Sequence, residues 1–413
     1  MSLAGDRVRV LYSFPHKLGA DRICYTAWQE VNCLAAAGAD VLAFPGVLHR
    51  PVAASVEVRP TLAWKKLRVS YKLLGKMGAL ALHDRIVARR VERLAGQVDI
   101  IHAWPVAALE TLKTAARLGI PTVLDRPNAH TRFAFETVKR EFDRLGMNLP
   151  PGDEYYYRKD VLEKEEAEYE LADFILCPSD FVVRTFVDQG VARSKLLRHT
   201  NGFDESVFFP SGDRNKTNPG LQMLFVGVCA VRKGLHFALE AWLKSPASRT
   251  GAFLIAGDFL PAYANKLSAM LSHPSVKVLG HRNDVAALMR DSDILILPSI
   301  EEGFGLVIAE AIGSGCVPLA SDACTEICRH MENGLVHGVG DVATLARQIA
   351  MLHEDRMLLG RLRAGCLKTA HEFTWTAAGV RLLQVYREAI SLYREREARS
   401  NFQPDSAARI VTR

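Results

Sequence analysis

Residues 294–326, ILILPSIEEGFGLVIAEAIGSGCVPLASDACTE, decide the fold of this 413-residue chain. The apolar run from Ile294 to Leu297 predicts a buried strand that ends at a Pro-Ser turn. A glycine-interrupted turn and a helix of about ten residues follow, and residues 317–320 predict a second buried strand. A strand that leads through such a turn into a helix predicts an anion site. The first N–H groups of a helix have no partners within it, and the helix dipole is positive there.

Two glutamates flank the turn and the helix start. Glu302 directly precedes Gly303-Phe304-Gly305, and Glu310 follows within the helix. If all the residues between them were helical, the two acids would lie about 12 Å apart along the axis, roughly the length of a sugar with a diphosphate. We therefore expect Glu310 to accept the ribose hydroxyls of a nucleotide while Glu302 faces the far end of the diphosphate. The alternative is a pair of solvated charges at a helix start.

The spacing of the two acids and the string around them resemble a known signature. Glu302 and Glu310 have seven residues between them, and the whole string PSIEEGFGLVIAEAIGSGCVPLAS is similar to the E-x7-E segment of family 4 of the retaining glycosyltransferases, the group 1 glycosyl transferases. The resemblance covers most of the chain and is strongest over residues 224–320. It implies the GT-B fold, an α/β architecture of two Rossmann-like doubly wound parallel-sheet domains that face each other across a cleft.

The same resemblance implies a reaction. It is the transfer of a hexosyl group from a nucleoside diphosphate sugar to the hydroxyl of a carbohydrate or lipid-linked acceptor, with retention of anomeric configuration, in polysaccharide, glycolipid or glycoconjugate synthesis. No cofactor beyond the donor and no metal is implied. Two rivals stay open, namely a phosphorylase or epimerase on the same fold, and a non-catalytic partner subunit that keeps a nucleotide-sugar pocket.

Composition and charge narrow the protein class. Hydrophobic residues make up 49% and charged residues 24%, which is typical of a globular chain with room for two domains. A net charge of +6 is too small to indicate nucleic-acid binding. The chain starts without a signal-sequence pattern and has no long apolar run, so we expect a cytoplasmic protein. The eight cysteines form no C-x2-C pair, which predicts reduced core thiols and no structural zinc site.

The first domain supplies two weaker candidates. A strand over residues 7–14, a turn at Gly19, a helix and a strand over residues 41–44 predict the opening of a doubly wound sheet. The resemblance implies that Gly19 faces the donor diphosphate, although an ordinary loop glycine fits equally well. His130 follows the strand at residues 120–125, where ligands bind in open parallel sheets. The resemblance implies that His130 contacts the transferred sugar or the acceptor, and the alternative is a loop histidine bonded to backbone.

The second domain opens with a strand over residues 221–228 and then carries Arg232 and Lys233 before Gly234. Two cations beside a glycine at a helix start suit a diphosphate. The resemblance implies that Lys233 neutralises the diphosphate of the donor. The family often has an arginine where this chain has Val228, and we expect Arg232 to supply that charge.

A further turn completes the donor site. A turn at Gly280, His281 and Arg282 follows the predicted strand at residues 276–279. The resemblance implies that backbone groups of this turn read the nucleobase. The predicted catalytic residues are thus Lys233, Arg232, Glu302 and His130, and the remaining candidates bind the donor. We expect an acceptor-binding domain at residues 1–210, a nucleotide-sugar-binding domain at 220–372, a returning helix at 373–397 and a mobile tail at 398–413.

The segment at residues 61–93 is basic and amphipathic. Trp64, Leu67, Tyr71 and Leu74 recur at helical spacing with lysines and arginines between them. This pattern is typical of a helix that packs on the core with a basic solvated face, which we favour. The alternative is peripheral contact with the anionic inner face of a membrane.

Overall fold

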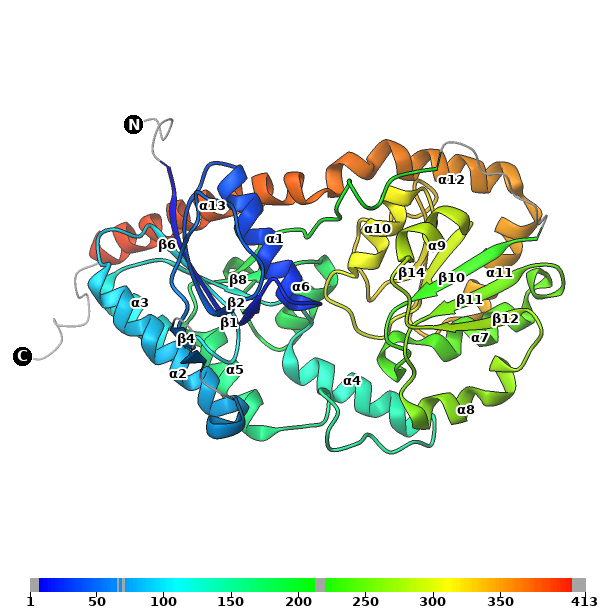
Figure 1. Cartoon of the computed structure of the whole chain (residues 1–413), viewed down its shortest axis with the longest axis horizontal. Coiled ribbons are helices and arrows are strands. Elements are labelled where there is room, and N and C mark those ends of the chain that lie inside the picture. Colours follow the sequence, from blue (N-terminus) through cyan, green and yellow to red (C-terminus); the bar gives the residue numbers. More distant parts are fainter. Residues whose placement is uncertain (1–6, 65–66, 69–70, 212–219, 403–413) are drawn as a thin grey trace, which may run out of the picture.

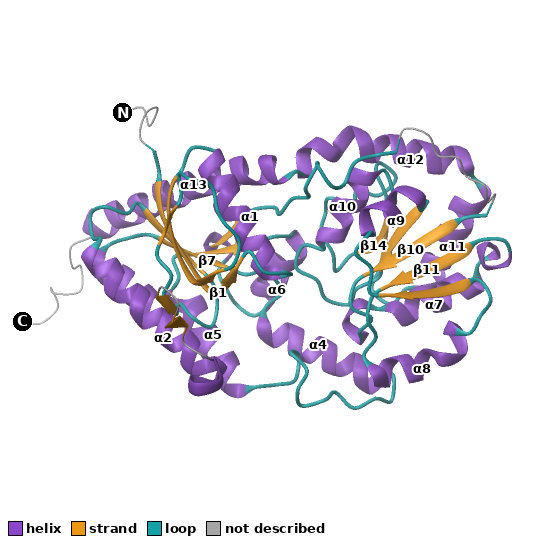
Figure 2. Cartoon of the chain, in the orientation of Figure 1, coloured by secondary structure: helices purple, strands orange, loops and turns teal. Residues whose placement is uncertain are grey.

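The computed structural model describes residues 7–64, 67–68, 71–211 and 220–402. Two lobes lie side by side, and each contains one sheet with helices packed around it (Figures 1 and 2). The strands within each of these two sheets are parallel, so both sheets are buried between helices, as is usual for doubly wound domains. The predicted fold class is therefore confirmed.

The first sheet has the order β3-β2-β1-β6-β7-β8-β9. Consecutive strands run outward from β1 in one direction and from β6 in the other, so the strand order reverses between β1 and β6. The strands of this sheet are β1 Arg9–Leu18, β2 Asp40–Leu48, β3 Glu57–Val58, β6 Ile100–Ala103, β7 Thr122–Asp125, β8 Phe174–Cys177 and β9 Leu196–Arg198. The helices of this part of the chain are α1 Ile23–Ala36, α2 Tyr71–Arg93, α3 Leu109–Leu118, α4 Thr131–Arg144, α5 Lys159–Leu171, α6 Asp180–Asp188 and the 3-10 helix η1 Arg193–Lys195.

The second sheet has the order β12-β11-β10-β13-β14-β15 and reverses between β10 and β13. In open parallel sheets, ligands bind beyond the carboxyl ends of the strands at such a reversal. The strands are β10 Gln222–Val226, β11 Ala252–Ala256, β12 Val276–Gly280, β13 Ile294–Leu297, β14 Val317–Ser321 and β15 Leu335–His337. The helices are η2 Val231–Lys233, α7 Leu235–Lys244, η3 Pro246–Arg249, α8 Pro261–Leu271, α9 Val285–Asp291, α10 Leu306–Ser314, α11 Val342–Glu354, α12 Arg356–Thr369, η4 Ala370–Phe373 and α13 Trp375–Phe402.

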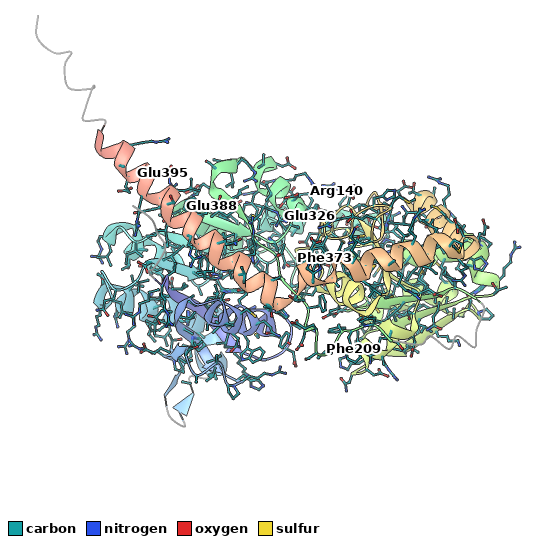
Figure 3. The ribbon with its side chains drawn as sticks, turned by 90° about the horizontal axis from the view of Figure 1, so that it is seen from above. Arg140, Phe209, Glu326, Phe373, Glu388 and Glu395 are labelled. Atoms are coloured by element: carbon teal, nitrogen blue, oxygen red, sulfur yellow. The ribbon has the colours of Figure 1, made fainter. Side chains whose placement is uncertain are left out.

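Two helices cross between the lobes. Helix α13 leaves the second lobe near Phe373 and runs along the first lobe past Glu388 (Figure 3), and its apolar face, including Tyr386, joins the core of the first domain. Helix α4 crosses in the opposite sense, since Phe135 and Phe142 belong to the same apolar cluster as the second domain. The lobes are therefore joined by packed apolar surface as well as by the chain.

The decisive segment folds as predicted, with β13, a turn, α10 and β14 in order. Residues 302–305, however, are not helical, so the 12 Å estimate for the separation of the two glutamates does not apply. The helix expected from Trp64 onward is wrong at its start. Ala63–Trp64 and Leu67–Arg68 form a two-stranded hairpin, β4 and β5, and α2 begins only at Tyr71 with a non-helical residue at Gly75.

Three further expectations concern the cysteines, bilayer-spanning helices and the tail. The eight cysteines are free thiols, most of them buried, as predicted. No described helix combines the length and the apolar character that a bilayer-spanning segment needs. Helix α13 continues to Phe402, past the end predicted at residue 397. Residues 403–413 of the predicted tail lie outside the described residues, as do residues 65–66 and 69–70 of the basic segment.

Gly234 tests how closely the loops after β10 and β13 must approach. It has φ 65°, and a Cβ atom there would collide with the Pro298 carbonyl oxygen, whereas Gly119 has φ 68° and open space around it. We expect Gly119→Ala to cost only the left-handed backbone strain of about 1–2 kcal/mol. Gly234→Ala should lower the melting temperature several times more than Gly119→Ala does, because it adds a collision with the Pro298 carbonyl oxygen to the same strain. Equal shifts for the two variants would contradict this close packing.

Candidate active site

The site is built on the loops that follow β10 and β13, on either side of the strand reversal in the second sheet. The first loop contains the short helix η2, which carries Arg232 and Lys233. The second contains Glu301 and Glu302. The two loops are bonded directly, because the Ile300 N–H donates to the Arg232 carbonyl oxygen at 2.9 Å.

A buried cluster of opposite charges lies at this junction. Lys233 Nζ forms an ion pair with Glu302 Oε2, and an Arg232 guanidinium nitrogen lies 3.5 Å from Glu302 Oε1. Burial by itself would raise the pKa of Glu302, but the charges of Lys233 and Arg232 outweigh it and lower that pKa to about 2. Glu302 is therefore ionised at neutral pH, and two cations are held at fixed positions beside it.

Glu301 links this cluster to the first domain. Its side chain is fully buried, and Oε1 accepts a hydrogen bond from the Ala129 N–H at 3.0 Å. Arg232 donates both to Glu301 Oε2 at 3.3 Å and to the Glu301 carbonyl oxygen at 2.8 Å. The guanidinium also lies 5.3 Å from the ring centroid of Tyr155, a first-domain residue. The charged cluster therefore lies at the contact between the two domains.

The first-domain loop that meets Glu301 is itself held in place. Arg126 forms a buried ion pair with Glu165 at 3.0 Å and donates two hydrogen bonds to the Ala129 carbonyl oxygen, at 2.9 and 3.1 Å. A Cβ atom at Gly303 would collide with the Pro127 carbonyl oxygen. Glycine at position 303 thus allows the two domains to touch at the base of the site.

The remaining residues of the turn shape the start of α10. Phe304 is buried in the core of the second domain, and Gly305 takes φ 73° as the N-terminal flanking residue of the helix. That backbone conformation favours glycine. The turn therefore presents the start of α10 next to the cation cluster, as the sequence predicts.

Glu310 lies in the second turn of α10 and is half-buried. Burial raises the pKa of Tyr25 on α1, and the charges of Asp204 and Glu310 add to that increase. Burial also raises the pKa of Glu310 itself, to about 7. This carboxyl group therefore changes charge within the physiological pH range.

Gly280, His281 and Arg282 lie apart from the charged cluster. Gly280 ends β12, the edge strand, which β11 and β10 separate from β13, and His281 and Arg282 follow it. The His281 side chain is 72% exposed, and Arg282 pairs with Asp284 at the surface. The turn is nevertheless on the carboxyl side of the same sheet, because the Gly257 N–H donates to the Gly280 carbonyl oxygen at 2.8 Å and the Gly227 N–H donates to the Ala256 carbonyl oxygen at 3.0 Å.

The two candidates of the first domain, Gly19 and His130, lie in a loop turn and in a buried position, respectively. Gly19 forms the turn between β1 and α1 with φ 88°, and its N–H donates to the Cys24 carbonyl oxygen at 3.0 Å. His130 is buried at the start of α4, where its ring packs on Tyr169 and Phe186. Burial, with Arg126 and Arg132 nearby, lowers the pKa of His130 to about 3, so its ring is neutral. Its contact with sugar or acceptor stays a prediction.

The structure thus brings Arg232, Lys233 and Glu302 together and adds three residues that the sequence did not single out. Glu301 has only its position beside Glu302 as a signal. Tyr155 stands in a run of tyrosines, and Arg126 precedes a proline in a loop, so neither is distinguishable without the fold. Their roles depend on contacts between residues distant in sequence, which no local pattern reveals.

Comparison with known proteins identifies the family. Residues 220–355 match the family model described as glycosyl transferases group 1. The chain is 32% identical over 335 residues to a D-inositol 3-phosphate glycosyltransferase of Salinispora tropica, covering 74% of this chain and 67% of the relative. The chain belongs to the group 1 glycosyltransferase family. It is accordingly a glycosyltransferase, and the family match falls on the domain that carries the charged cluster.

Solved structures of other proteins share the fold of this group 1 glycosyltransferase. HepE of Anabaena, crystallised in complex with UDP, aligns with a TM-score of 0.63 at 16% identity over 94% of this chain and all of its own. WaaG, a glycosyltransferase involved in lipopolysaccharide biosynthesis, aligns with a TM-score of 0.63 at 14% identity over 92% of this chain and 99% of its own. Both likenesses concern the fold alone, and they identify it as GT-B.

Proposed function

We propose that this glycosyltransferase moves a hexosyl group from a nucleoside diphosphate sugar to an acceptor hydroxyl, with retention of configuration. The observation that carries the proposal is the pair of cations, Arg232 and Lys233, held against Glu302 at the strand reversal of the second sheet. Negative charge builds on the diphosphate as its bond to the sugar breaks. Cations that already contact the bound diphosphate stabilise that charge without further reorganisation when the bond breaks.

Lys233 and Arg232 have different parts in this proposal. Lys233 has one described ion-pair partner, Glu302, so its ammonium can turn toward a bound diphosphate. Arg232 is fixed by Glu301 and by the ring of Tyr155, and it supplies a stationary positive charge. With Val228 where the family often has arginine, Arg232 is the second cation of the site. Two built-in cations leave no need for a divalent metal on the diphosphate.

Glu302 is proposed to hold hydroxyls of the transferred sugar rather than to attack it. A carboxylate whose pKa is about 2 is a weak base and a poor nucleophile. Retention then follows from front-face attack, in which an oxygen of the departing phosphate takes the proton of the acceptor hydroxyl. The O–H bond of the acceptor breaks as its oxygen bonds to the sugar, and the nucleoside diphosphate leaves with that proton.

The nucleotide is proposed to lie between Glu310 and the turn at residues 280–282. Glu310 accepts hydrogen bonds from the ribose hydroxyls, and backbone groups of the turn contact the base. HepE, a protein of the same fold, was crystallised in complex with UDP, which supports a nucleotide as the ligand of this chain. The acceptor is a carbohydrate or a lipid-linked sugar bound by loops of the first domain, which reaches the site through Ala129 and Tyr155.

Variants of Lys233 and Glu310 separate the two roles. Lys233→Ala should lower kcat about 100-fold or more, because it removes a charge that acts as the diphosphate leaves. Glu310→Ala should instead weaken nucleoside diphosphate binding about tenfold, a loss of about 1.4 kcal/mol, with a smaller effect on kcat at saturating donor. Steady-state kinetics and calorimetry with UDP-, GDP- and ADP-sugars measure both effects.

Lys244→Ala is the matched control for Lys233→Ala. Lys244 ends helix α7, is exposed and pairs only at the surface with Glu240, so its removal should leave kcat within about twofold. If Lys233→Ala also kept wild-type turnover while the nucleotide still bound, the assignment of Lys233 to the departing diphosphate would be wrong.

The raised pKa of Glu310 predicts a pH dependence of nucleotide affinity. The carboxyl group is neutral below its pKa of about 7 and charged above it, and a hydrogen bond to a charged acceptor is the stronger one. As pH rises from 6 to 8, the affinity of the wild type relative to Glu310→Gln should therefore increase about three- to tenfold. Both proteins bind the same nucleotide, so the ratio of their affinities removes the effect of phosphate titration. A ratio that stays constant across this range would exclude Glu310 from the nucleotide site.

A further inference from the structure

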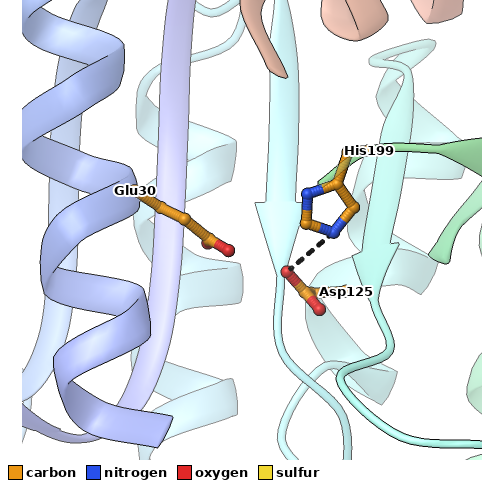
Figure 4. Close-up of side chains that lie close together, drawn as sticks. All are labelled: Glu30, Asp125 and His199. Atoms are coloured by element: carbon orange, nitrogen blue, oxygen red, sulfur yellow. Dashed lines mark ion pairs between the residues drawn. The ribbon is translucent and has the colours of Figure 1, made fainter. Parts of the chain in front are cut away.

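A second cluster of polar side chains lies inside the first domain, away from the loops after β10 and β13. Glu30 on α1, Asp125 at the end of β7 and His199 just after β9 converge beneath the surface (Figure 4), and their ligand-type atoms lie within 4.8 Å of one another. His102 on β6 joins them, with Nε2 3.5 Å from Asp125 Oδ2. All four residues are at least 96% buried.

The atoms that face one another in this cluster have no hydrogen-bond partner among the described residues. They are Glu30 Oε1, Asp125 Oδ2, His102 Nε2 and His199 Nε2. Leaving one buried polar atom unpaired costs about 1–3 kcal/mol, and more for a charged group. The ligand-type atoms of Glu30, Asp125 and His199 lie within 4.8 Å of one another, and His102 Nε2 lies beside Asp125 Oδ2. A positive species between them, either a set of protons or a metal ion, would offset this cost.

The distances favour the metal ion. Asp125 Oδ2 lies 3.5 Å from His102 Nε2 and 3.9 Å from His199 Nε2, which is too far for a proton to bridge as a hydrogen bond of about 2.7–3.0 Å. Two ligands of one tetrahedral ion, each bonded at about 2.0–2.1 Å, lie about 3.3 Å apart. The 3.5 Å separation is near that value, the 3.9 Å separation is longer, and both are beyond the usual hydrogen-bonding range.

Residues around the cluster orient it as outer-shell partners orient metal ligands. The Tyr12 hydroxyl donates to Glu30 Oε2 at 2.5 Å and accepts from Trp104 Nε1 at 2.8 Å, which leaves Glu30 Oε1 directed inward. His102 Nδ1 is bonded to the Tyr386 hydroxyl at 2.6 Å, and its ring stacks on Tyr12 with centroids 4.3 Å apart. These contacts hold the carboxylate and one imidazole in place.

The protonation of the histidines agrees with a ligand role. Burial lowers the pKa of His102 to about 4 and that of His199 to about 3, so both rings are neutral at pH 7, as metal ligands must be. Burial raises the pKa values of Glu30 and Asp125 to about 8, which reflects the cost of two carboxylates in an apolar interior without a cation.

We propose that Glu30, Asp125 and His199, with His102 beside Asp125, form a structural site of the first domain for one divalent transition-metal ion. Imidazole nitrogen together with carboxylate oxygens suits Zn²⁺ and similar ions better than Mg²⁺ or Ca²⁺, which prefer oxygen ligands. The site uses none of the eight cysteines.

Such an ion would join α1, β6, β7 and the segment after β9 beneath α13, whose Tyr386 contacts His102. Asp125 directly precedes Arg126, which shapes the loop that meets Gly303 and Glu301 of the second domain. The ion therefore stabilises the first domain and the loop that covers the catalytic cluster, and it takes no part in sugar transfer.

The test starts with the wild-type full-length chain. Metal analysis by mass spectrometry after purification without chelators should find about one zinc-class ion per molecule. Removal of the ion with dipicolinate should lower the melting temperature by several degrees, and Zn²⁺ should restore it. Reconstitution with Co²⁺ should produce the visible absorption bands of a four-coordinate site with nitrogen and oxygen ligands.

Variants then locate the ion. His199→Ala and Asp125→Asn should each reduce the bound metal at least tenfold, whereas His371→Ala, an exposed histidine in η4, should keep it. Failure of the wild type to bind Zn²⁺, Co²⁺ or Mn²⁺ above background, with no response of the melting temperature to chelator, would overturn the proposal. An increase in stability on Glu30→Gln or Asp125→Asn would then identify a proton-sharing cluster. Both outcomes are independent of transferase activity.

Discussion

The burial of Glu302 between Lys233 and Arg232 is the constraint on which the catalytic half of the molecule depends. A carboxylate removed from water is costly unless cations and hydrogen bonds surround it, and removing one partner of such a group is more damaging than omitting the whole set. The loops after β10 and β13 must therefore stay close together. Gly234 permits that approach, and the parallel sheet places both loops at the same edge.

The same cluster determines how the two domains meet. Arg232 bonds to Glu301, and Glu301 accepts the Ala129 N–H of the first domain, so the charged cluster and the contact between domains share residues. Helices α4 and α13 add apolar contacts on two sides of the molecule. A diphosphate that draws Lys233 away from Glu302 would therefore alter the forces that hold the domains together. Under the proposed function, donor binding and domain contact are therefore physically coupled.

Much of the fold could be predicted from the sequence because its signals are local. Apolar runs such as residues 294–297 and glycine turns such as residues 303–305 specify strands and helix starts within a few residues. The antiparallel pairing of β4 with β5 was missed, because two strands of two residues each leave no periodicity to detect and the spacing of apolar residues there suits a helix. Helix α4 was missed as an interdomain element, since its apolar face meets a partner far away in sequence.

The candidate site was predictable only in part, for the same reason. Lys233, Arg232 and Glu302 belong to recognisable segments, whereas Glu301 and Tyr155 matter because the two domains meet there.

The placement of the diphosphate at the charged cluster is tested most directly by hydrogen exchange of backbone amides, measured with and without saturating UDP, GDP or ADP. We expect the nucleotide that binds to protect peptides over residues 227–236 and 298–312. Binding that leaves both segments unprotected would contradict the placement of the diphosphate at the charged cluster.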